Sequence, residues 1–316
     1  MDWEDVEVSF LAGIDIGGTK ISAALVQPSG EVIATGTVPS PASQGGAAML
    51  QASTSLLRSL ERDAGQSASA VGVGAAGVLR DGVVRAASSL FPGWVGTDIA
   101  GELGSRLDRP VVAINDVNAF LLGELTWGSL AGSNSALALM LGTGVGAALM
   151  LDGEVYFGPS GAAGELGHAP GYSDYTCTCG GRGHLETVAS GRSIGLRYGE
   201  LTGRTGLSGA DVAELASRGD EAALATIENA AAAIAVAITQ VTLLLDVHDI
   251  VFGGGLTASW ELLRDRIEAQ LRSNPPVTGT LPSLQLGQLN NAAAGAAAAA
   301  LAHHTATPPR SDSGRP

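Results

Sequence analysis

The stretch Asp15-Ile16-Gly17-Gly18-Thr19-Lys20 decides the fold of this chain. Apolar runs at Phe10–Ile16 and Ile21–Val26 flank it, which predicts two strands joined by a glycine turn. Glycine N–H groups approach phosphate oxygens closely, the threonine adds a hydroxyl, and Asp15 can hold Mg²⁺ through water. The lysine of the stretch is the only one in the chain and supplies a compact positive charge. The stretch therefore suits a nucleotide phosphate, and a hairpin turn without a ligand is the alternative.

The same order of elements recurs in the second part of the chain. An apolar run at Ala136–Leu141 leads into Gly142-Thr143-Gly144, and the runs Val145–Leu151 and Glu154–Phe157 follow it. We infer a duplicated unit in which each glycine turn faces a shared cleft. Gly142-Thr143-Gly144 is then the second phosphate turn.

The segments around the two hairpins alternate between helical and strand patterns, which indicates α/β layers. A helix is expected over Gly46–Arg62, strands over Val71–Val78 and Val111–Ile114, and a buried helix over Ala230–Leu245.

An apolar run at 250–252 enters Gly253-Gly254-Gly255, which we expect to approach the adenosine; with 45 glycines in the chain, a simple turn is the alternative. The last helix is expected over 290–304, and the tail 305–316 is expected to be disordered.

Composition limits the function classes. The 316 residues carry a formal charge of −14, so a nucleic-acid backbone is not an expected partner. The acidic N-terminus is unlike a signal peptide, and no apolar stretch reaches the length of about 20 residues that a bilayer span needs. Two cysteines are too few for a disulfide framework. We expect a cytoplasmic protein that does not bind membranes.

Asn115-Asp116 follows the strand expected at Val111–Ile114 and precedes a helical stretch at Ala119–Trp127. An aspartate at a strand end, where loops line a cleft, can accept the proton of a hydroxyl as it attacks a γ-phosphate. Helix N-capping is the alternative, because Asn and Asp serve that role often.

The densest group of metal-ligating side chains is His168, Cys177, Cys179 and His184. Thiolate and imidazole groups at this spacing suit tetrahedral Zn²⁺, and the intervening glycines let the backbone fold around an ion. A closed set of four ligands would stabilise the loop rather than activate water. The alternative is a loop with incidental cysteines.

Glu165, His168 and Glu186 lie in or beside this group. Carboxylates accept hydrogen bonds from sugar hydroxyls, and an imidazole can bind a metal through one nitrogen and a hydroxyl through the other. Solvated surface carboxylates are the alternative.

Taken together, these motifs resemble the ROK family of sugar kinases and repressors, in particular its glucokinase-like members. The resemblance runs from Gly13 to about Ala302 and is specific in order and spacing. It rests on D-I-G-G-T-K at 15–20, N-D-x-N-A at 115–119, L-G-T-G-V-G at 141–146, G-E-L-G-H at 164–168, C-x-C-G-G-x-G at 177–183, L-E at 185–186, S-G at 190–191 and G-G-G at 253–255.

The resemblance implies an α/β, actin-like (hexokinase or RNase H-like) ATPase fold with two domains around a cleft. The small domain would contain 10–117 plus about 290–304, and the larger one 118–289 with the zinc loop. It further implies Asp116 as the catalytic base, and Asn115, Glu165, His168 and Glu186 as ligands of the sugar hydroxyls. Zinc would be held by His168, Cys177, Cys179 and the residue at 184, and the family commonly forms dimers or tetramers.

Three positions depart from the family pattern. His184 stands where a cysteine is usual, which leaves a Cys₂His₂ set that can still bind zinc. Ala76 stands where a proline commonly precedes the glycine at Gly77, so the loop on the sugar side is expected to be looser. The asparagine often found shortly before the Gly-Trp pair is missing from 88–91, which leaves the identity of the sugar open.

The expected function is ATP- and Mg²⁺-dependent phosphorylation of a hexose, with the 6-hydroxyl of glucose as the first candidate and a place in glycolysis and carbohydrate metabolism. Alternatives are a kinase for N-acetylmannosamine, another hexose or a cyclitol, a non-catalytic sugar sensor, and polyphosphate as the donor. A repressor of this family needs a DNA-binding domain ahead of the first glycine turn, and about ten residues cannot form one.

Overall fold

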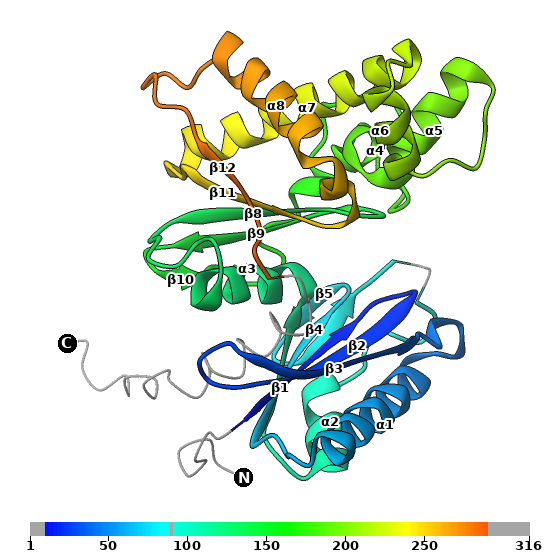
Figure 1. Cartoon of the computed structure of the whole chain (residues 1–316), viewed down its shortest axis with the longest axis vertical. Helices are drawn as coiled ribbons and strands as arrows, with labels where there is room; N and C mark the ends of the chain where they lie inside the picture. The colour runs from blue at the N-terminus through cyan, green and yellow to red at the C-terminus, as the bar shows by residue number, and fades with distance from the viewer. Residues whose placement is uncertain (1–9, 89–90, 290–316) are drawn as a thin grey trace.

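Two five-stranded sheets with the same strand order form the framework of the protein in a computed structural model that describes residues 10–88 and 91–289 (Figure 1). In each sheet the first three strands pair antiparallel and the last two add in parallel. This repetition confirms the duplicated unit. The first sheet runs β3 (Val32–Pro39), β2 (Lys20–Val26), β1 (Leu11–Ile16), β4 (Ala70–Ala75) and β7 (Val111–Asn115); the second runs β10 (Glu154–Val155), β9 (Val145–Leu151), β8 (Ala136–Leu141), β11 (Asp249–Gly253) and β12 (Ser283–Leu286).

Helices cover each sheet, and one helix lies between the two lobes (Figure 1). The lower lobe in the figure carries α1 and α2, and the upper lobe carries α4 to α8. The helix α3 touches strands of both sheets and so joins the lobes. The bounds are α1 (Gly46–Ala64), α2 (Ile99–Leu107), α3 (Asp116–Trp127), α4 (Glu186–Ala189), α5 (Gly191–Thr202), α6 (Gly209–Ser217), α7 (Glu221–Leu245) and α8 (Trp260–Ser273). A hairpin of β5 (Val78–Arg80) and β6 (Val83–Ala86) and the short 3-10 helices η2 (Ala42–Gln44), η3 (Leu166–His168) and η4 (Gly255–Ser259) complete the described elements.

Strand β8 shows how side-chain alternation separates the two faces of the second sheet. Leu137, Leu139 and Leu141 pack into the core beneath the upper helices. Ala136 and Ala138 face the opposite way and pack with residues of α3. Since successive side chains of a strand point to opposite faces, the leucines meet the large core and the small alanines let α3 approach closely.

The helix α7 is long and apolar enough to cross a membrane by length and composition, but half of its apolar window is buried within the protein. Its buried positions, among them Ile227, Ile234 and Ile238, repeat at helical spacing and end at Thr242. The prediction of a buried helix is confirmed up to that residue and is wrong for the last turn, where Leu244 is 81% exposed.

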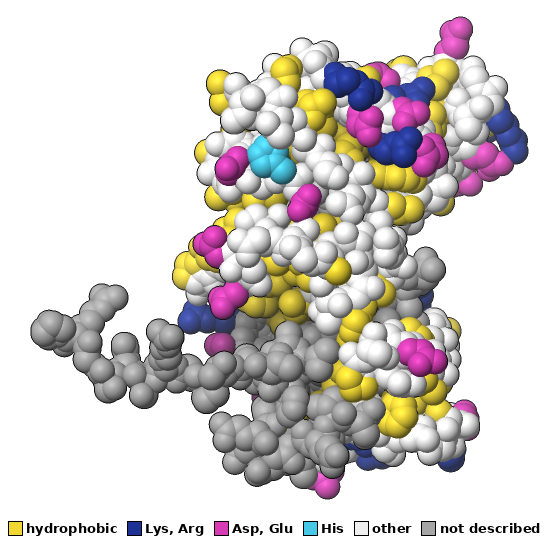
Figure 2. Space-filling model, turned by 60° about the vertical axis from the view of Figure 1, so that its left-hand side comes forward, with side chains coloured by type: hydrophobic (Ala, Val, Ile, Leu, Met, Phe, Trp, Pro, Cys, Tyr) yellow, Lys and Arg dark blue, Asp and Glu magenta, His cyan; other side chains and the backbone are white. Residues whose placement is uncertain are grey.

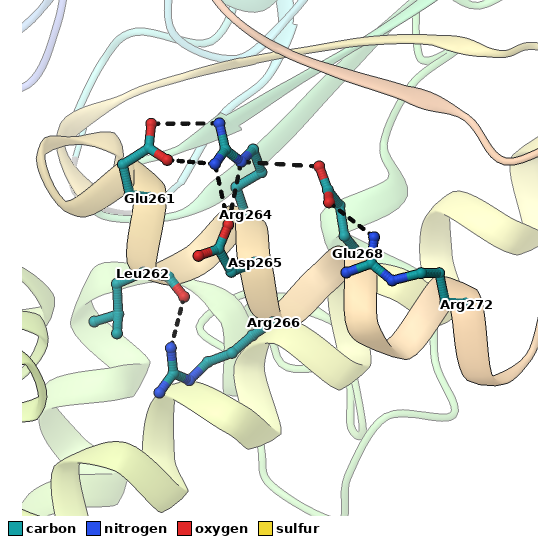
Figure 3. Close-up of polar contacts among 7 residues, drawn as sticks. All are labelled: Glu261, Leu262, Arg264, Asp265, Arg266, Glu268 and Arg272. Atoms are coloured by element: carbon teal, nitrogen blue, oxygen red, sulfur yellow. Dashed lines mark hydrogen bonds and ion pairs between the residues drawn. The ribbon is translucent and has the colours of Figure 1, made fainter.

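The helix α8 covers α7 with one apolar face and presents a charged face to solvent. Leu263, Ile267 and Leu271 are buried, whereas Arg264 lies among three carboxylates on the outer side (Figure 3). Arg266 pairs with Glu228 of α7 at 3.3 Å, which ties the two helices together. On the face drawn in Figure 2, basic side chains likewise lie beside acidic ones on the upper lobe.

Two contacts of α3 tie it to segments distant in the sequence. The indole N–H of Trp127 donates to the Pro28 carbonyl at 3.3 Å, and the ring lies so close to Gly30 that a Cβ there would be 2.5 Å from it. The Glu124 carboxylate is fully buried and accepts backbone hydrogen bonds from residues 288 and 289 at 3.0 and 2.8 Å. The β2–β3 turn and the segment after β12 are therefore both fixed against this helix.

Two expected elements are shorter than predicted. The strand expected over Val71–Val78 ends at Ala75, because Gly77 adopts a φ of +113° and turns the chain into β5. The strand expected over Glu154–Phe157 contains only its first two residues. The helix expected over 290–304 and the disordered tail lie outside the described residues. We retain the proposed domain boundary near 117, which falls in the first turn of α3.

Candidate active site

A cavity of about 860 Å³ opens between the lobes and brings both glycine turns together. Gly17 and Gly18, between β1 and β2, line one side, and Gly142-Thr143-Gly144, between β8 and β9, lines another. The N-terminus of α5 lies against the second turn, since the Gly191 N–H donates to the Gly142 carbonyl at 2.8 Å. Backbone N–H groups and a positive helix end at such a turn are suited to phosphate oxygens.

Asp116 stands at the start of α3 and faces this cavity. The predicted alternative of a helix cap applies to its neighbour, because the Asn115 side-chain oxygen accepts from the backbone N–H of Val117 at 2.9 Å and of Asn118 at 3.3 Å. The Asn115 amide also donates to the Gly77 carbonyl at 3.0 Å, which orients this residue beside the cavity. Asp116 is therefore not the N-cap residue: its Oδ1 accepts the backbone N–H of Val117 at 3.0 Å, and the residue lines the cavity.

Burial is the main reason why the pKa values of Asp15 and Asp116 are raised. It raises the pKa of Asp116, although hydrogen bonds from backbone N–H groups and Asn115 act in the opposite direction. The pKa of Asp15 rises from 3.8 to about 7, first through burial and then through the negative charge of Asp116, while Lys20 lowers it. The alternation of β1 buries Ile14 and Ile16 in the lower core and turns Asp15 to the other face. A divalent cation bound to phosphate oxygens would offset the negative charge of both carboxylates.

Glu165, His168 and Glu186 meet on the wall of the cavity formed by the upper lobe. Nε2 of His168 lies 3.9 Å from the Glu165 carboxylate. Burial raises the pKa of Glu165, His168 lowers it, and the charges of Asp116 and Glu186 raise it further. This group of closely spaced hydrogen-bonding side chains is suited to a polyhydroxyl ligand.

Glu186 also connects two parts of the site. One of its oxygens accepts from the Val145 backbone N–H at 3.1 Å, directly after the second glycine turn. Its other oxygen accepts from the Thr178 hydroxyl at 3.2 Å, on the cysteine loop. Gly144 permits this approach, because a Cβ there would lie 2.4 Å from the carboxylate. The glycine turn and the cysteine loop are thus held by the same side chain.

The four candidate metal ligands converge. One ligand atom from each of His168, Cys177, Cys179 and His184 lies within 4.8 Å of the others. Nδ1 of His168 is 3.7 Å from Sγ of Cys177, and Nδ1 of His184 is 3.4 Å from Sγ of Cys179. Bond lengths of about 2.3 Å to sulfur and 2.0 Å to nitrogen place such atoms about 3.5 Å apart in a tetrahedral site. The residues therefore fit Zn²⁺, and Nε2 of His168 remains directed towards Glu165.

Other predicted residues lie near the cavity without lining it. Asp15 lies near the end of β1, Thr19 in the turn and Lys20 at the start of β2, but the lining of the cavity here comes from Gly17 and Gly18. Gly253-Gly254-Gly255 is also not part of the lining; the φ of Gly254 is +90°, and a Cβ there would lie 2.6 Å from the Leu141 backbone. The triplet is thereby packed directly behind the second glycine turn. Gly77 does line the cavity, on the side of the lower lobe.

Sequence reasoning did not identify several lining side chains. Arg197 of α5 stacks over the ring of Tyr175 with its guanidinium carbon 3.3 Å from the ring centroid, so the cysteine loop is pressed against α5. Thr178 is the residue between the two cysteines, and its hydrogen bond to Glu186 forms only when the loop folds back onto α4. Phe91 lies over Gly18, where a Cβ would be 3.0 Å from its ring. The aromatic residues and the arginine carried no local motif that distinguishes them from core or surface positions.

Comparison with known proteins relates this geometry to a family. Residues 11–305 match the model of the ROK family. The chain is 32% identical to a glucokinase of Thermotoga maritima, with 80% of this chain and 84% of that protein covered. It is 30% identical to an N-acetyl-D-glucosamine kinase of Photobacterium profundum, at 86% and 92% coverage. A ROK family glucokinase from Streptomyces griseus, solved in complex with glucose and AMPPNP, is 27% identical with a TM-score of 0.80, covering 92% of this chain and 98% of that one.

Proposed function

Since this chain belongs to the ROK family and has its actin-like fold, we propose that it is an ATP-dependent hexose kinase that phosphorylates the 6-hydroxyl of glucose. The observation that supports the proposal most directly is the cavity in which two glycine turns and Asp116 meet a group of hydrogen-bonding side chains. Relatives named as glucokinase and N-acetyl-D-glucosamine kinase support a hexose as the acceptor.

In the proposed reaction the glycine turns bind the phosphate chain of ATP. The group of hydrogen-bonding side chains formed by Glu165, His168 and Glu186 binds the sugar hydroxyls. Asn115 adds an amide N–H to the sugar side. Asp116 accepts the proton of the attacking hydroxyl while the new oxygen–phosphorus bond forms and ADP leaves. Mg²⁺ bound near Asp15 would neutralise charge on the phosphates. The raised pKa of Asp116 makes its carboxylate a stronger base than an exposed aspartate.

The donor, sugar and class of function are tested together in a coupled assay for ADP. Glucose, N-acetylglucosamine, N-acetylmannosamine, fructose and a cyclitol are each supplied with ATP, and polyphosphate replaces ATP in a parallel series. We expect turnover with ATP and the highest kcat/KM with glucose. Binding of a sugar without phosphorylation of any would instead identify a sensor.

We further propose that the four convergent ligands hold a structural Zn²⁺. Substituting Cys177→Ser is expected to remove the metal and to lower the melting temperature, because zinc binding contributes directly to the folding free energy of the loop. Metal analysis of purified wild-type and variant protein measures the first effect and calorimetry the second. Thr176→Ser, an exposed neighbour on the same loop, is the matched control. Full activity of metal-free wild-type protein would contradict a structural role.

We propose a cytoplasmic enzyme of sugar metabolism that forms a homodimer or homotetramer, as the resemblance implies. Light scattering of the purified full chain is expected to give twice or four times the monomer mass of 31.6 kDa, and a monomer at all concentrations would contradict the assembly.

A further inference from the structure

The imidazole of His184 lies directly on the backbone of Gly181. A Cβ added to Gly181 would be 2.3 Å from Cε1 of the ring and 2.6 Å from Nε2. Real carbon contacts are never this short, so either the ring or the backbone would have to move. Position 181 therefore accommodates the ring in this place only when it carries no side chain.

The Nδ1 atom of the same ring faces the other candidate ligands and lies 3.4 Å from the position of the added Cβ. Nδ1 is 3.4 Å from Sγ of Cys179, so Nδ1 is the nitrogen placed to bind a metal. In this orientation Cε1 and Nε2 are the ring atoms that lie closest to the glycine. The ring is thus held between the metal position and the backbone of residue 181.

The backbone at Gly181 has little freedom to yield. Its carbonyl accepts the N–H of Cys177 at 2.8 Å, and the N–H of Gly180 donates to the Cys177 carbonyl at 3.0 Å. The two hydrogen bonds close a tight turn around the first cysteine ligand. Shifting Gly181 away from the ring would therefore disturb that cysteine.

We infer that Gly181 is a positioning residue for the metal, required because residue 184 is a histidine. This inference rests on the proposed zinc site. Without metal the His184 ring can rotate away from a methyl group, whereas a ring bound through Nδ1 cannot. A methyl group at 181 should weaken the metal-bound state and leave the fold of the metal-free state unchanged. A cysteine at 184 has no atoms beyond Sγ, so it would not need the space.

The test is a double-mutant cycle of Gly181→Ala and His184→Cys in the full chain. The Zn²⁺ dissociation constant of each protein is measured by competition with a chromophoric chelator. We expect Gly181→Ala to weaken zinc binding by about 10- to 100-fold, the range typical of residues that support a metal ligand. In the His184→Cys background the same change is expected to alter the Zn²⁺ dissociation constant less than about threefold. A difference of this size is typical of substitutions that do not interact with each other.

Further measurements separate this inference from failure of the zinc site or of folding. Wild-type protein without bound zinc would refute the metal site itself, and the inference with it. Gly104→Ala on α2 is the matched control, because a Cβ there makes only ordinary contacts at 3.5 Å or more. Melting of the metal-free Gly181→Ala protein is expected at the wild-type temperature. Equal losses of zinc affinity in both backgrounds, or none in either, would overturn the inference.

Discussion

Replacing Asp116 with asparagine is expected to lower kcat by about 10² to 10⁴-fold, the usual contribution of a general base. The amide keeps the shape of the side chain but cannot take the proton of the sugar hydroxyl. Asn115 caps α3, so the helix should retain its start when Asp116 is changed. Steady-state assays with saturating ATP and sugar measure the effect.

Binding measurements identify the cause of this loss. Sugar affinity of Asp116→Asn, determined by calorimetry, should stay within about tenfold of wild type if the change affects the chemical step alone. Asp63→Asn, at an exposed position on α1, is the control for the substitution itself. A kcat of Asp116→Asn within threefold of wild type would refute the assignment of the base.

Replacing Asp15 with asparagine is expected to stabilise the protein at neutral and alkaline pH while it removes most of the activity. The pKa of Asp15 is about 7 in the folded protein and 3.8 in an unperturbed chain. The folded state therefore holds this proton more tightly, so the contribution to stability is complete below pH 4 and is lost as the pH rises to about 7. At about 1.4 kcal/mol per unit of pKa, the loss reaches about 4 kcal/mol.

Urea denaturation at pH 5 and pH 8, in buffer without added Mg²⁺, tests this expectation. The difference in unfolding free energy between Asp15→Asn and wild type should grow from the lower to the higher pH. Added Mg²⁺ and ATP should reduce it by stabilising only the wild type. A difference that is the same at both pH values would show that the Asp15 carboxylate is not perturbed as described.

The local motifs of this site could be predicted because each is a short stretch that acts through its own backbone. Gly17 and Gly18 lie in the short connection between the antiparallel strands β1 and β2, and the ligands from His168 to His184 lie within one stretch of 17 residues. The order of the first three strands in each sheet was likewise visible as a repeated sequence of runs and turns.

Contacts between distant segments could not be predicted in the same way. The hydrogen bond from Val145 to Glu186 spans 41 residues, and neither residue indicates its partner. The stacking of Arg197 on Tyr175 depends on how α5 packs beside the loop. The last turn of α7 is apolar in sequence and exposed in the fold, because hydrophobicity alone does not show where the covering helices end.

The contact between Trp127 and the β2–β3 turn provides an optical signal built into the protein. The indole N–H is bonded to Pro28 of the lower lobe, while its helix α3 also packs on the upper sheet. Trp94, by contrast, is fully buried within the lower lobe and donates to the Ala76 carbonyl. A rotation of one lobe against the other would change the surroundings of the first indole and spare the second. In a variant in which the other three tryptophans are replaced, the emission of Trp127 can therefore follow lobe movement in solution without an attached dye.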